Sequence, residues 1–497
     1  MRMVQYLVRN STLRLVSFGV GIVFALFVTP VIINAIGQAA YGVWALISAT
    51  VANYLLLDFG LSQAVSKFVA AAIAREDQKE INRICSTGIA LNIVSCLLSL
   101  VITIALLYLG RDHIPQGTDF AQVQTYFAIY AGTFSLLFLF RTWNGVLAAE
   151  MRWTLLALIS MVKNVVVSLS VLIWISGENG LLFLSVVNGA GFLFEGIVYW
   201  IFARRGFSAS IRFRHVDWRL GGELFRFGLT SLVAQLGQAM RFRSQPYIIV
   251  KTIGAEGVAV FSIATQLITY FTNLIRSAFG IFIPHFSRLQ AKHDHDGIRQ
   301  SMLGALWLSY RVSAYVGLCL VFYGGEFVDL WLGPEFRDVQ LVLVPMALGS
   351  IFSTSIIPAQ EFLMGISQHR ITAICNIGEG ICVVLASMFS MMYWGIIGVG
   401  WSFFFCAFIF RAYLLPYYAF RQAGLPFLNY LQLIGCVALT HVLPQWIFWI
   451  LVRDYMGTGY LSLFAMSVMQ GLVVIVVQYG LFRLDRRLVG FGDAART

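Results

Sequence analysis

Two short stretches of this sequence, IGQAAYGVW at residues 36–44 and IGAEGVAVF at residues 253–261, are similar, and their residue numbers differ by 217. With no gap, the polar segments that follow also correspond, ARED at 74–77 with AKHD at 291–294. The alternative is a chance likeness between two glycine-containing loops. Because two separate loops agree in one register, we favour an internal repeat at an offset of 217.

The composition around these loops is that of a membrane protein. Of the 497 residues, 59% are hydrophobic and 11% are charged, whereas a soluble domain has about 25% charged residues. A helix that spans a bilayer needs about 20 apolar residues, and no alternation of the kind found in membrane β-strands occurs. The sequence therefore predicts an all-α integral membrane protein with about 14 transmembrane helices. The apolar runs lie at 13–33, 41–73, 84–109, 120–140, 154–176, 180–202, 224–250, 257–284, 302–323, 339–365, 371–393, 396–416, 430–452 and 460–481.

The repeat divides these spans into two sets of six. Spans 1–6 and 7–12 have matching lengths and loop sizes. Since six is even, both sets enter the membrane in the same direction, and a substrate site is expected between such parallel repeats. We therefore predict two parallel six-helix lobes around a central cavity, residues 1–210 and 211–425, followed by two C-terminal helices and a tail at 426–497.

Lysine and arginine predict the orientation. Of the 34 such residues, 23 fall in segments on the side of the N-terminus, 4 on the opposite side and 7 within the spans. Cytoplasmic segments carry the excess of positive charge, so both termini are predicted to be cytoplasmic in a multi-pass protein of the cell inner (plasma) membrane. Basic loops facing an anionic leaflet also account for the net charge of +11 without a nucleic-acid partner.

Three glycines are predicted to shape the first two spans. Gly37 and Gly42 bracket a tight turn between them, where glycine permits positive φ and close approach of helices. A purely structural hairpin is the alternative at that turn. Gly60 lies deep within the second span and is a candidate bend or hinge.

The segments TPVIINAIG at 29–37, YGVW at 41–44 and DFGL at 58–61 resemble polysaccharide and O-unit flippases of the multidrug/oligosaccharidyl-lipid/polysaccharide (MOP) superfamily. The resemblance implies a MATE/MOP-like fold and alternating access of two lobes. It also implies that a polyprenyl-pyrophosphate-linked oligosaccharide or polysaccharide repeat unit crosses the inner membrane with its tail in membrane lipid. Glycosyltransferases and a polymerase of the same pathway would then be expected partners. By analogy with lipid II flippases, the last two helices would help to form a groove for the lipid tail.

Eleven ionisable residues fall within the predicted spans, and each is costly at the centre of a bilayer. Three near the inner boundary, Lys67, Arg141 and Glu361, can extend toward the headgroups. Seven cations against four carboxylates leave an excess that suits an anionic headgroup, such as a sugar pyrophosphate. The other eight are Lys163, Arg241, Arg243, Arg276, Arg311, Asp58, Glu195 and Glu379.

Four of these cations are the predicted substrate-binding residues. Arginine binds phosphate through two parallel hydrogen bonds, and we assign the phosphate or acidic sugars to Lys163, Arg241, Arg276 and Arg311. For each residue, the alternative is a structural ion pair.

Three carboxylates are assigned to gating or ion coupling. Asp58 lies one position from the repeat equivalent of Arg276, so the two are predicted to face each other across the lobe interface. The alternative is that each pairs within its own lobe. Glu195 and Glu379 are candidates for coupling to Na⁺ or H⁺, and the alternative is that each pairs with a cation.

No nucleophile triad, phosphate-binding loop or zinc spacing occurs, so no catalytic residue, metal site or cofactor other than a coupling ion is predicted. A multidrug/ion antiporter on the same scaffold is the alternative transporter. A membrane glycan polymerase or ligase is a less favoured alternative, because the outer loops, such as 110–120 and 324–339, are short. The second of these loops carries Glu326, Asp329, Glu335 and Asp338.

Overall fold

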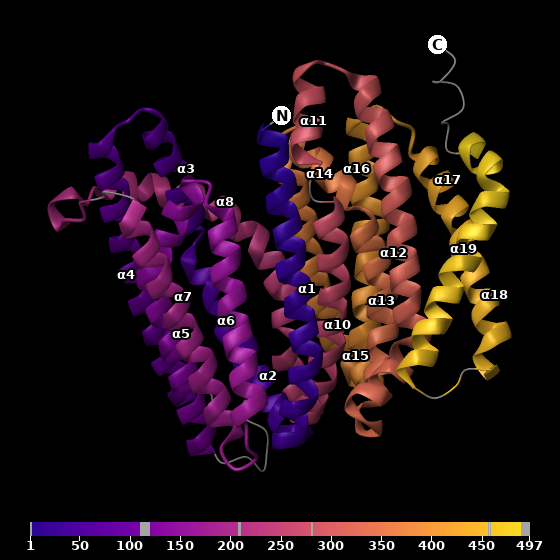
Figure 1. Ribbon diagram of the computed structural model, residues 1–497, viewed down its shortest axis with the longest axis horizontal. Helices are drawn as coiled ribbons and strands as arrows, with labels where there is room; N and C mark the ends of the chain where they lie inside the picture. The colour runs from indigo at the N-terminus through magenta and orange to yellow at the C-terminus, as the bar shows by residue number, and fades with distance from the viewer. Residues whose placement is uncertain are drawn as a thin grey trace. The chain divides into compact units, whose positions relative to one another are not determined.

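The computed structural model describes residues 2–109, 120–206, 210–279, 282–455, 457 and 459–488. Every regular element in these ranges is a helix (Figure 1). Helices satisfy their own backbone hydrogen bonds, which a segment in contact with lipid tails must do because no water is available there. The chain divides into two compact units, residues 1–239 with 246–259 and residues 240–245 with 260–497.

Unit 1 is built around α5, which packs against α3, α4 and α7, while α1 packs on α6. Its core includes Val65, Ile84, Trp143 and Leu147, none more than 3% exposed. The elements of this unit are α1 (Arg2–Ile36), α2 (Gln38–Asn53), η1 (Tyr54–Asp58), α3 (Leu61–Ala74), α4 (Gln78–Leu109), α5 (Phe120–Ala149), α6 (Trp153–Trp174), α7 (Gly180–Gly206), η3 (Phe213–His215), α8 (Trp218–Gln238), most of α9 (Gln245–Thr252) and the start of α10 (Ala255–Phe279).

Unit 2 is built around α12, α13 and α15, and its largest buried side chains are aromatic: Phe286, Phe362, Phe420 and Tyr430. The last helices, α17 to α19, lie beside α12 (Figure 1). The elements of this unit are most of η4 (Ala239–Arg243), the rest of α10, α11 (Ile283–Ala291), α12 (His295–Leu332), η5 (Pro334–Phe336), α13 (Val339–Ser355), α14 (Ile357–Gly365), α15 (His369–Ala407), η6 (Phe408–Leu414), α16 (Leu415–Gln422), α17 (Phe427–Val437), η7 (Ala438–Val442), α18 (Leu443–Val452), η8 (Arg453–Tyr455) and α19 (Tyr460–Leu488).

Twelve helices among the described residues are long and apolar enough to cross a membrane, against fourteen predicted runs. One of the twelve, residues 370–422, covers two predicted runs, because the backbone turns at Gly395 (φ 57°, ψ −142°). Another predicted run, 224–250, is divided among α8, η4 and α9 by a π-helical turn. The all-helical membrane architecture is present, and the count of fourteen stays a prediction.

In the two loops that the sequence aligns, equivalent residues have positive φ at the same places. Gly37 and Gly254, which the repeat makes equivalent, have φ of 82° and 93°, and each directly precedes a helix. Glu76 and His293, a second equivalent pair, have φ of 56° and 53°. Positive φ is uncommon for residues other than glycine. Its occurrence at both Glu76 and His293 therefore supports the repeat that the sequence predicts.

The units do not divide at the predicted boundary of 210/211, because α8 is grouped with unit 1. A backbone contact with the break before α3 holds it there. A Cβ added at Gly60 would lie 2.6 Å from the carbonyl oxygen of Gly228 on α8. The linker before α8 is also fixed to α4, since the backbone N–H of Ser210 donates to Asn82 Oδ1 (2.8 Å) and that of Asp217 to Thr87 Oγ1 (3.0 Å).

Candidate functional site

A charged cluster in unit 1 joins α6 and α7. Lys163 Nζ on α6 lies 2.8 Å from Glu195 Oε2 on α7, and the two side chains are only 18% and 13% exposed. The other carboxylate oxygen, Glu195 Oε1, accepts hydrogen bonds from Ser160 Oγ (2.9 Å) and Tyr199 OH (2.5 Å). The structure shows that Glu195 is paired, and its role in ion coupling stays a prediction. A carboxylate whose two oxygens both accept hydrogen bonds, one of them from a cation, costs less free energy within a membrane segment than an unpaired carboxylate does.

A second ion pair in unit 1 lies at the break between η1 and α3. Phe59 (φ 45°) and Gly60 (φ 69°) turn the chain, and Asp58 Oδ1 then accepts from Ser62 Oγ (3.2 Å) on the next helix. Arg141 Nε on α5 binds the same oxygen at 3.1 Å. Asp58 is therefore paired within its own unit, which corrects the expectation that Arg276 is its partner. It also corrects the expectation that Arg141 extends toward the headgroups.

Unit 2 contains a more deeply buried carboxylate. Glu379 on α15 is 1% exposed, and Arg241 Nη1 on η4 lies 2.6 Å from its Oε1. Arg411 on η6 binds the other oxygen through Nε at 2.7 Å, and its Nη2 also donates to Asn376 Oδ1 at 2.7 Å. Glu379 is thus paired as well, and its role in ion coupling stays a prediction. The sequence prediction counts Arg411 among the 23 cations on the side of the N-terminus. The structure corrects this, because it buries Arg411 with its guanidinium bound to Glu379.

The remaining predicted cations of unit 2 differ in their surroundings. Arg276 on α10 is exposed and interacts electrostatically with Glu361, Arg241 and Arg411. Arg311 on α12 is 5% exposed, and its guanidinium carbon lies 3.6 Å from the centroid of the Trp307 ring. Of the four predicted substrate residues, the structure joins Arg241 to Arg411 through Glu379, and Arg276 is near enough to interact electrostatically with both arginines. Lys163 lies in unit 1.

Cations outnumber carboxylates within the apolar segments of unit 2. Four arginines of unit 2 were assigned to the spans and the structure adds Arg411, which gives five against Glu361 and Glu379. One carboxylate cannot neutralise two arginines, so the Glu379 cluster keeps a net positive charge. Arg276, whose side chain is exposed, contributes a further positive charge. This arrangement can bind an anion, since arginine forks match the oxygens of phosphates.

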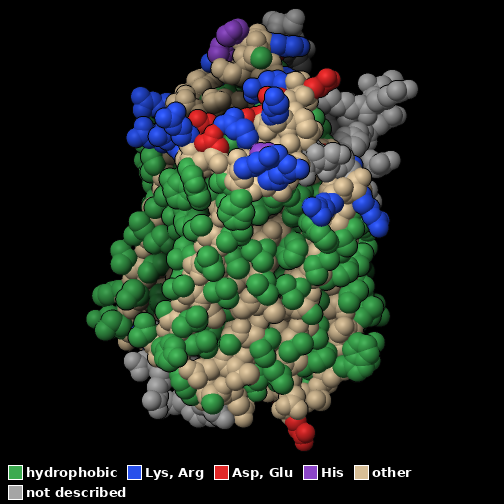
Figure 2. Space-filling view, turned by 90° about the vertical axis from the view of Figure 1, so that its left-hand side faces the viewer, with side chains coloured by type: hydrophobic (Ala, Val, Ile, Leu, Met, Phe, Trp, Pro, Cys, Tyr) green, Lys and Arg blue, Asp and Glu red, His purple; other side chains and the backbone are tan. Residues whose placement is uncertain are grey.

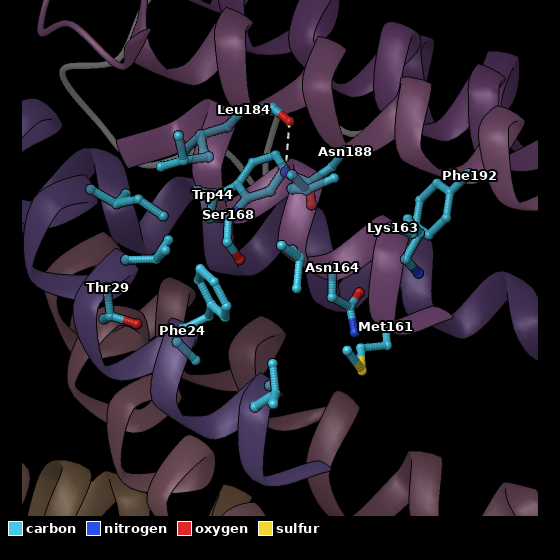
Figure 3. A pocket seen from close by; sticks show the side chains of 18 residues that line it. Phe24, Thr29, Trp44, Met161, Lys163, Asn164, Ser168, Leu184, Asn188 and Phe192 are labelled. Atoms are coloured by element: carbon cyan, nitrogen blue, oxygen red, sulfur yellow. Dashed lines mark hydrogen bonds between the residues drawn. The ribbon is translucent and has the colours of Figure 1, made fainter. Parts of the chain in front are cut away.

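A cavity of about 340 Å³ lies within unit 1, lined by residues of α1, α2, α6 and α7 (Figure 3). Its polar lining includes Thr29, Lys163, Asn164, Ser168 and Asn188. The lining positions on α1 (20, 24, 28 and 32) and on α7 (184, 188 and 192) recur every four residues, so each helix presents one face to the cavity. The amide, hydroxyl and ammonium groups of this lining can bind water or the polar groups of a ligand.

The three predicted glycines occupy special positions. Gly37 has positive φ, as the turn requires, and a Cβ at Gly42 would clash with the carbonyl oxygen of Ala255, also in unit 1. Gly60 lies at the helix break described above. Its movement as a hinge stays a prediction.

Exposed basic side chains of unit 1 gather at the ends of α3, α4 and α7, in the linker to α8 and in the first half of α8. Figure 2 shows Lys and Arg at one end of the face that it presents and hydrophobic side chains over most of the rest. One of these cations, Arg83, binds Asp217, and together with the backbone N–H groups at Leu220 and Arg219 it holds the pKa of Asp217 below the usual value. The exposed cations are Arg75, Lys79, Arg83, Arg204, Arg205, Arg212, Arg214, Arg219 and Arg226.

Comparisons with known proteins agree with this architecture. A family model described as "Polysaccharide biosynthesis protein" matches residues 7–290. The uncharacterized membrane protein EpsK of Bacillus subtilis (strain 168) is 23% identical over 392 residues, which are 76% of this chain and 75% of EpsK.

Two solved structures share the fold. One is an inward-facing multidrug resistance MATE family transporter of the MOP superfamily (TM-score 0.71, 14% identity, 83% of this chain and 98% of the other). The other is the lipid II flippase MurJ in an inward closed conformation (TM-score 0.70, 14% identity, 97% of this chain and 99% of the other). The predicted MATE/MOP-like fold is confirmed.

Proposed function

Because this chain belongs to the polysaccharide biosynthesis protein family, we propose that it is a flippase for a polyprenyl-pyrophosphate-linked oligosaccharide or polysaccharide repeat unit. The observation that carries the proposal is the cluster of arginines within the membrane segments of unit 2. Arg276 is exposed and would contact the pyrophosphate, while Arg241 and Arg411, held by Glu379, supply further positive charge nearby. The polyprenyl tail would stay in membrane lipid while the two lobes alternate in access.

The proposal extends to location, partners and energy source. The protein would lie in the cell inner membrane with cytoplasmic termini and receive its substrate from glycosyltransferases, before a polymerase uses the product. Na⁺ or H⁺ is the proposed coupling ion, with Glu195 and Glu379 as the carboxylates that respond to it. Transport that continues after both ion gradients are collapsed would remove this coupling role.

The arginine cluster also weighs against a multidrug/ion antiporter as the function. Five arginines against two glutamates repel cationic drugs, since like charges are unfavourable in a medium of low dielectric constant. An antiporter would predict drug sensitivity in a deletion strain with no change in glycan export.

The test is complementation of a deletion strain with variants of the arginine cluster. Arg276→Ala should lower glycan export roughly 10- to 100-fold, because a charged hydrogen bond contributes about 1.5–3 kcal/mol, and lipid-linked glycan should accumulate on the inner leaflet. Arg370→Ala removes an exposed arginine at the start of α15 and is the matched control. Arg241→Gln is the second variant, and Glu379 keeps Arg411 as its partner when Arg241 is replaced.

Normal export after alanine replacement of Lys163, Arg241, Arg276 and Arg311 together would contradict the cationic site. A fall in export with normal amounts of folded protein would support it, and size-exclusion chromatography of each variant supplies that measurement.

A further inference from the structure

We propose that the cavity of unit 1 binds a neutral sugar unit of the transported glycan, an inference that rests on the proposed function. The chemistry of its lining distinguishes it from the arginine cluster of unit 2. Its walls combine aromatic rings with amide and hydroxyl groups, and its volume of about 340 Å³ lies within the usual range for small-molecule sites, about 300–1,000 Å³.

Charge is the first argument for a neutral ligand. Among the 18 residues that line the cavity, Lys163 is the single charged one. Its ammonium group is already bound to Glu195 at 2.8 Å. An acidic sugar or a phosphate would have to compete with that carboxylate and would meet no second cation in the lining. A neutral ligand avoids this cost.

The polar groups have the dual character that sugar hydroxyls need. Each hydroxyl of a sugar both donates and accepts, and a side-chain amide offers the same two functions. Asn188 Nδ2 donates to the carbonyl oxygen of Leu184 at 2.9 Å, which leaves Oδ1 as an acceptor. The amide of Asn164 and the hydroxyl of Ser168, one turn apart on α6, make no hydrogen bond to any residue that the structure describes.

Aromatic rings supply the surface on which a sugar ring stacks. Figure 3 shows Phe24 and Trp44 around the same space as Asn164 and Ser168. Trp44 is held in place by Tyr130, with ring centroids 5.0 Å apart. The C–H bonds of a pyranose can therefore lie on a ring that is already ordered, while its hydroxyls reach the amides. Ordering before binding lowers the entropic cost of binding.

Glycine at position 21 allows a sharp test. Gly21 lines the cavity, and a Cβ added there meets nothing within 4 Å, so Gly21→Phe should place a ring in the cavity without disturbing the helix. Gly19 lies two residues earlier on α1, has equally open surroundings and does not line the cavity. Gly19→Phe is therefore the matched control. Asn164→Leu removes an amide at an exposed position with little change in volume.

The experiment measures binding to the purified full-length protein in lipid nanodiscs by saturation-transfer NMR. The probes are glucose, galactose and N-acetylglucosamine, with glucuronate and inorganic pyrophosphate as anions. We expect at least one neutral sugar to bind the wild type and Gly19→Phe, and its affinity to fall at least tenfold in Gly21→Phe and in Asn164→Leu. Glucuronate should bind more weakly than that sugar, and pyrophosphate binding should be unchanged in the cavity variants but lost in Arg276→Ala.

Several results would overturn the sugar site. The proposal fails if the wild type binds none of the neutral sugars, or if Gly21→Phe binds them as tightly as the wild type does. It also fails if glucuronate binds more tightly than every neutral sugar. Loss of co-purified lipid in Gly21→Phe without loss of sugar binding would identify a lipid site instead. The flippase proposal fails separately, if deletion of the gene leaves the distribution of lipid-linked glycan between leaflets unchanged while the purified protein still binds sugar.

Discussion

Glu379 offsets part of the positive charge of two buried arginines. Its carboxylate is 1% exposed and contacts both Arg241 and Arg411. Removal of one member of a buried pair leaves an uncompensated charge and costs about 3–5 kcal/mol. Glu379→Gln should therefore lower the melting temperature of the purified protein strongly. Glu326→Gln, which changes an exposed glutamate of α12, should leave it nearly unchanged. Equal melting temperatures for the two variants would show that the arginines are solvated some other way.

Sequence patterns could identify these charges but not their partners. Hydropathy placed Glu379 and Arg241 inside apolar runs, and the cost of a lone charge in lipid predicted that each has a partner or water. The choice of partner depends on the rotation of each helix about its axis and on its neighbours, which a one-dimensional pattern does not contain. The burial of Arg411 could have been predicted, because it lies five residues inside the apolar run that ends at 416. Counting it with the cations of the inner loops was wrong.

At the scale of the element, the break before α3 is set by local geometry. Gly60 has φ of 69°, and its α-carbon faces the backbone of α8 at Gly228. Gly60→Ala should destabilise the protein by at least about 1–2 kcal/mol, the cost of the left-handed conformation for a residue with a side chain. Gly132→Ala, in the open middle of α5, should stabilise it by up to about 1 kcal/mol. Thermal unfolding of both variants tests the opposite signs, and equal shifts would contradict the account.

The π-helical turns were not predicted, although they carry important polar side chains. Arg241 lies in η4, Arg411 in η6 and His441 in η7. One extra residue in a turn changes the direction of every later side chain, and neither hydropathy nor helix propensity reports such an insertion. The glycine turns, by contrast, could be predicted. Positions with positive φ, such as Gly37 and Gly254, are usually occupied by glycine, and glycine can be read directly from the sequence.

At the scale of the whole molecule, the asymmetry of basic residues predicts the side on which each loop lies. The 38 residues of α12 measure about 57 Å at 1.5 Å per residue, so its two ends lie on opposite sides of a hydrocarbon core of about 30 Å. Lys292→Cys, before α12, and Glu335→Cys, after it, are both exposed. A membrane-impermeant maleimide should label Glu335→Cys in intact cells and Lys292→Cys only after permeabilisation. The wild type controls for its seven native cysteines, and the reverse labelling pattern would overturn the proposed topology.

The spacing of ion-pair partners along the chain has a consequence for how the protein is made. Glu379 follows Arg241 by 138 residues, whereas Glu195 follows Lys163 by 32. At about 5–20 residues per second of synthesis, Lys163 waits about 2–6 s for its carboxylate and Arg241 about 7–28 s. During that interval Arg241 lacks its carboxylate, and a lone arginine at the centre of a bilayer costs about 2.5–3.5 kcal/mol on the insertion scale. This cost favours a helix that stays beside water or the insertion machinery until α15 emerges from the ribosome. The order in which the ribosome delivers charges would thus make insertion of the second unit the slow step in the biogenesis of this protein.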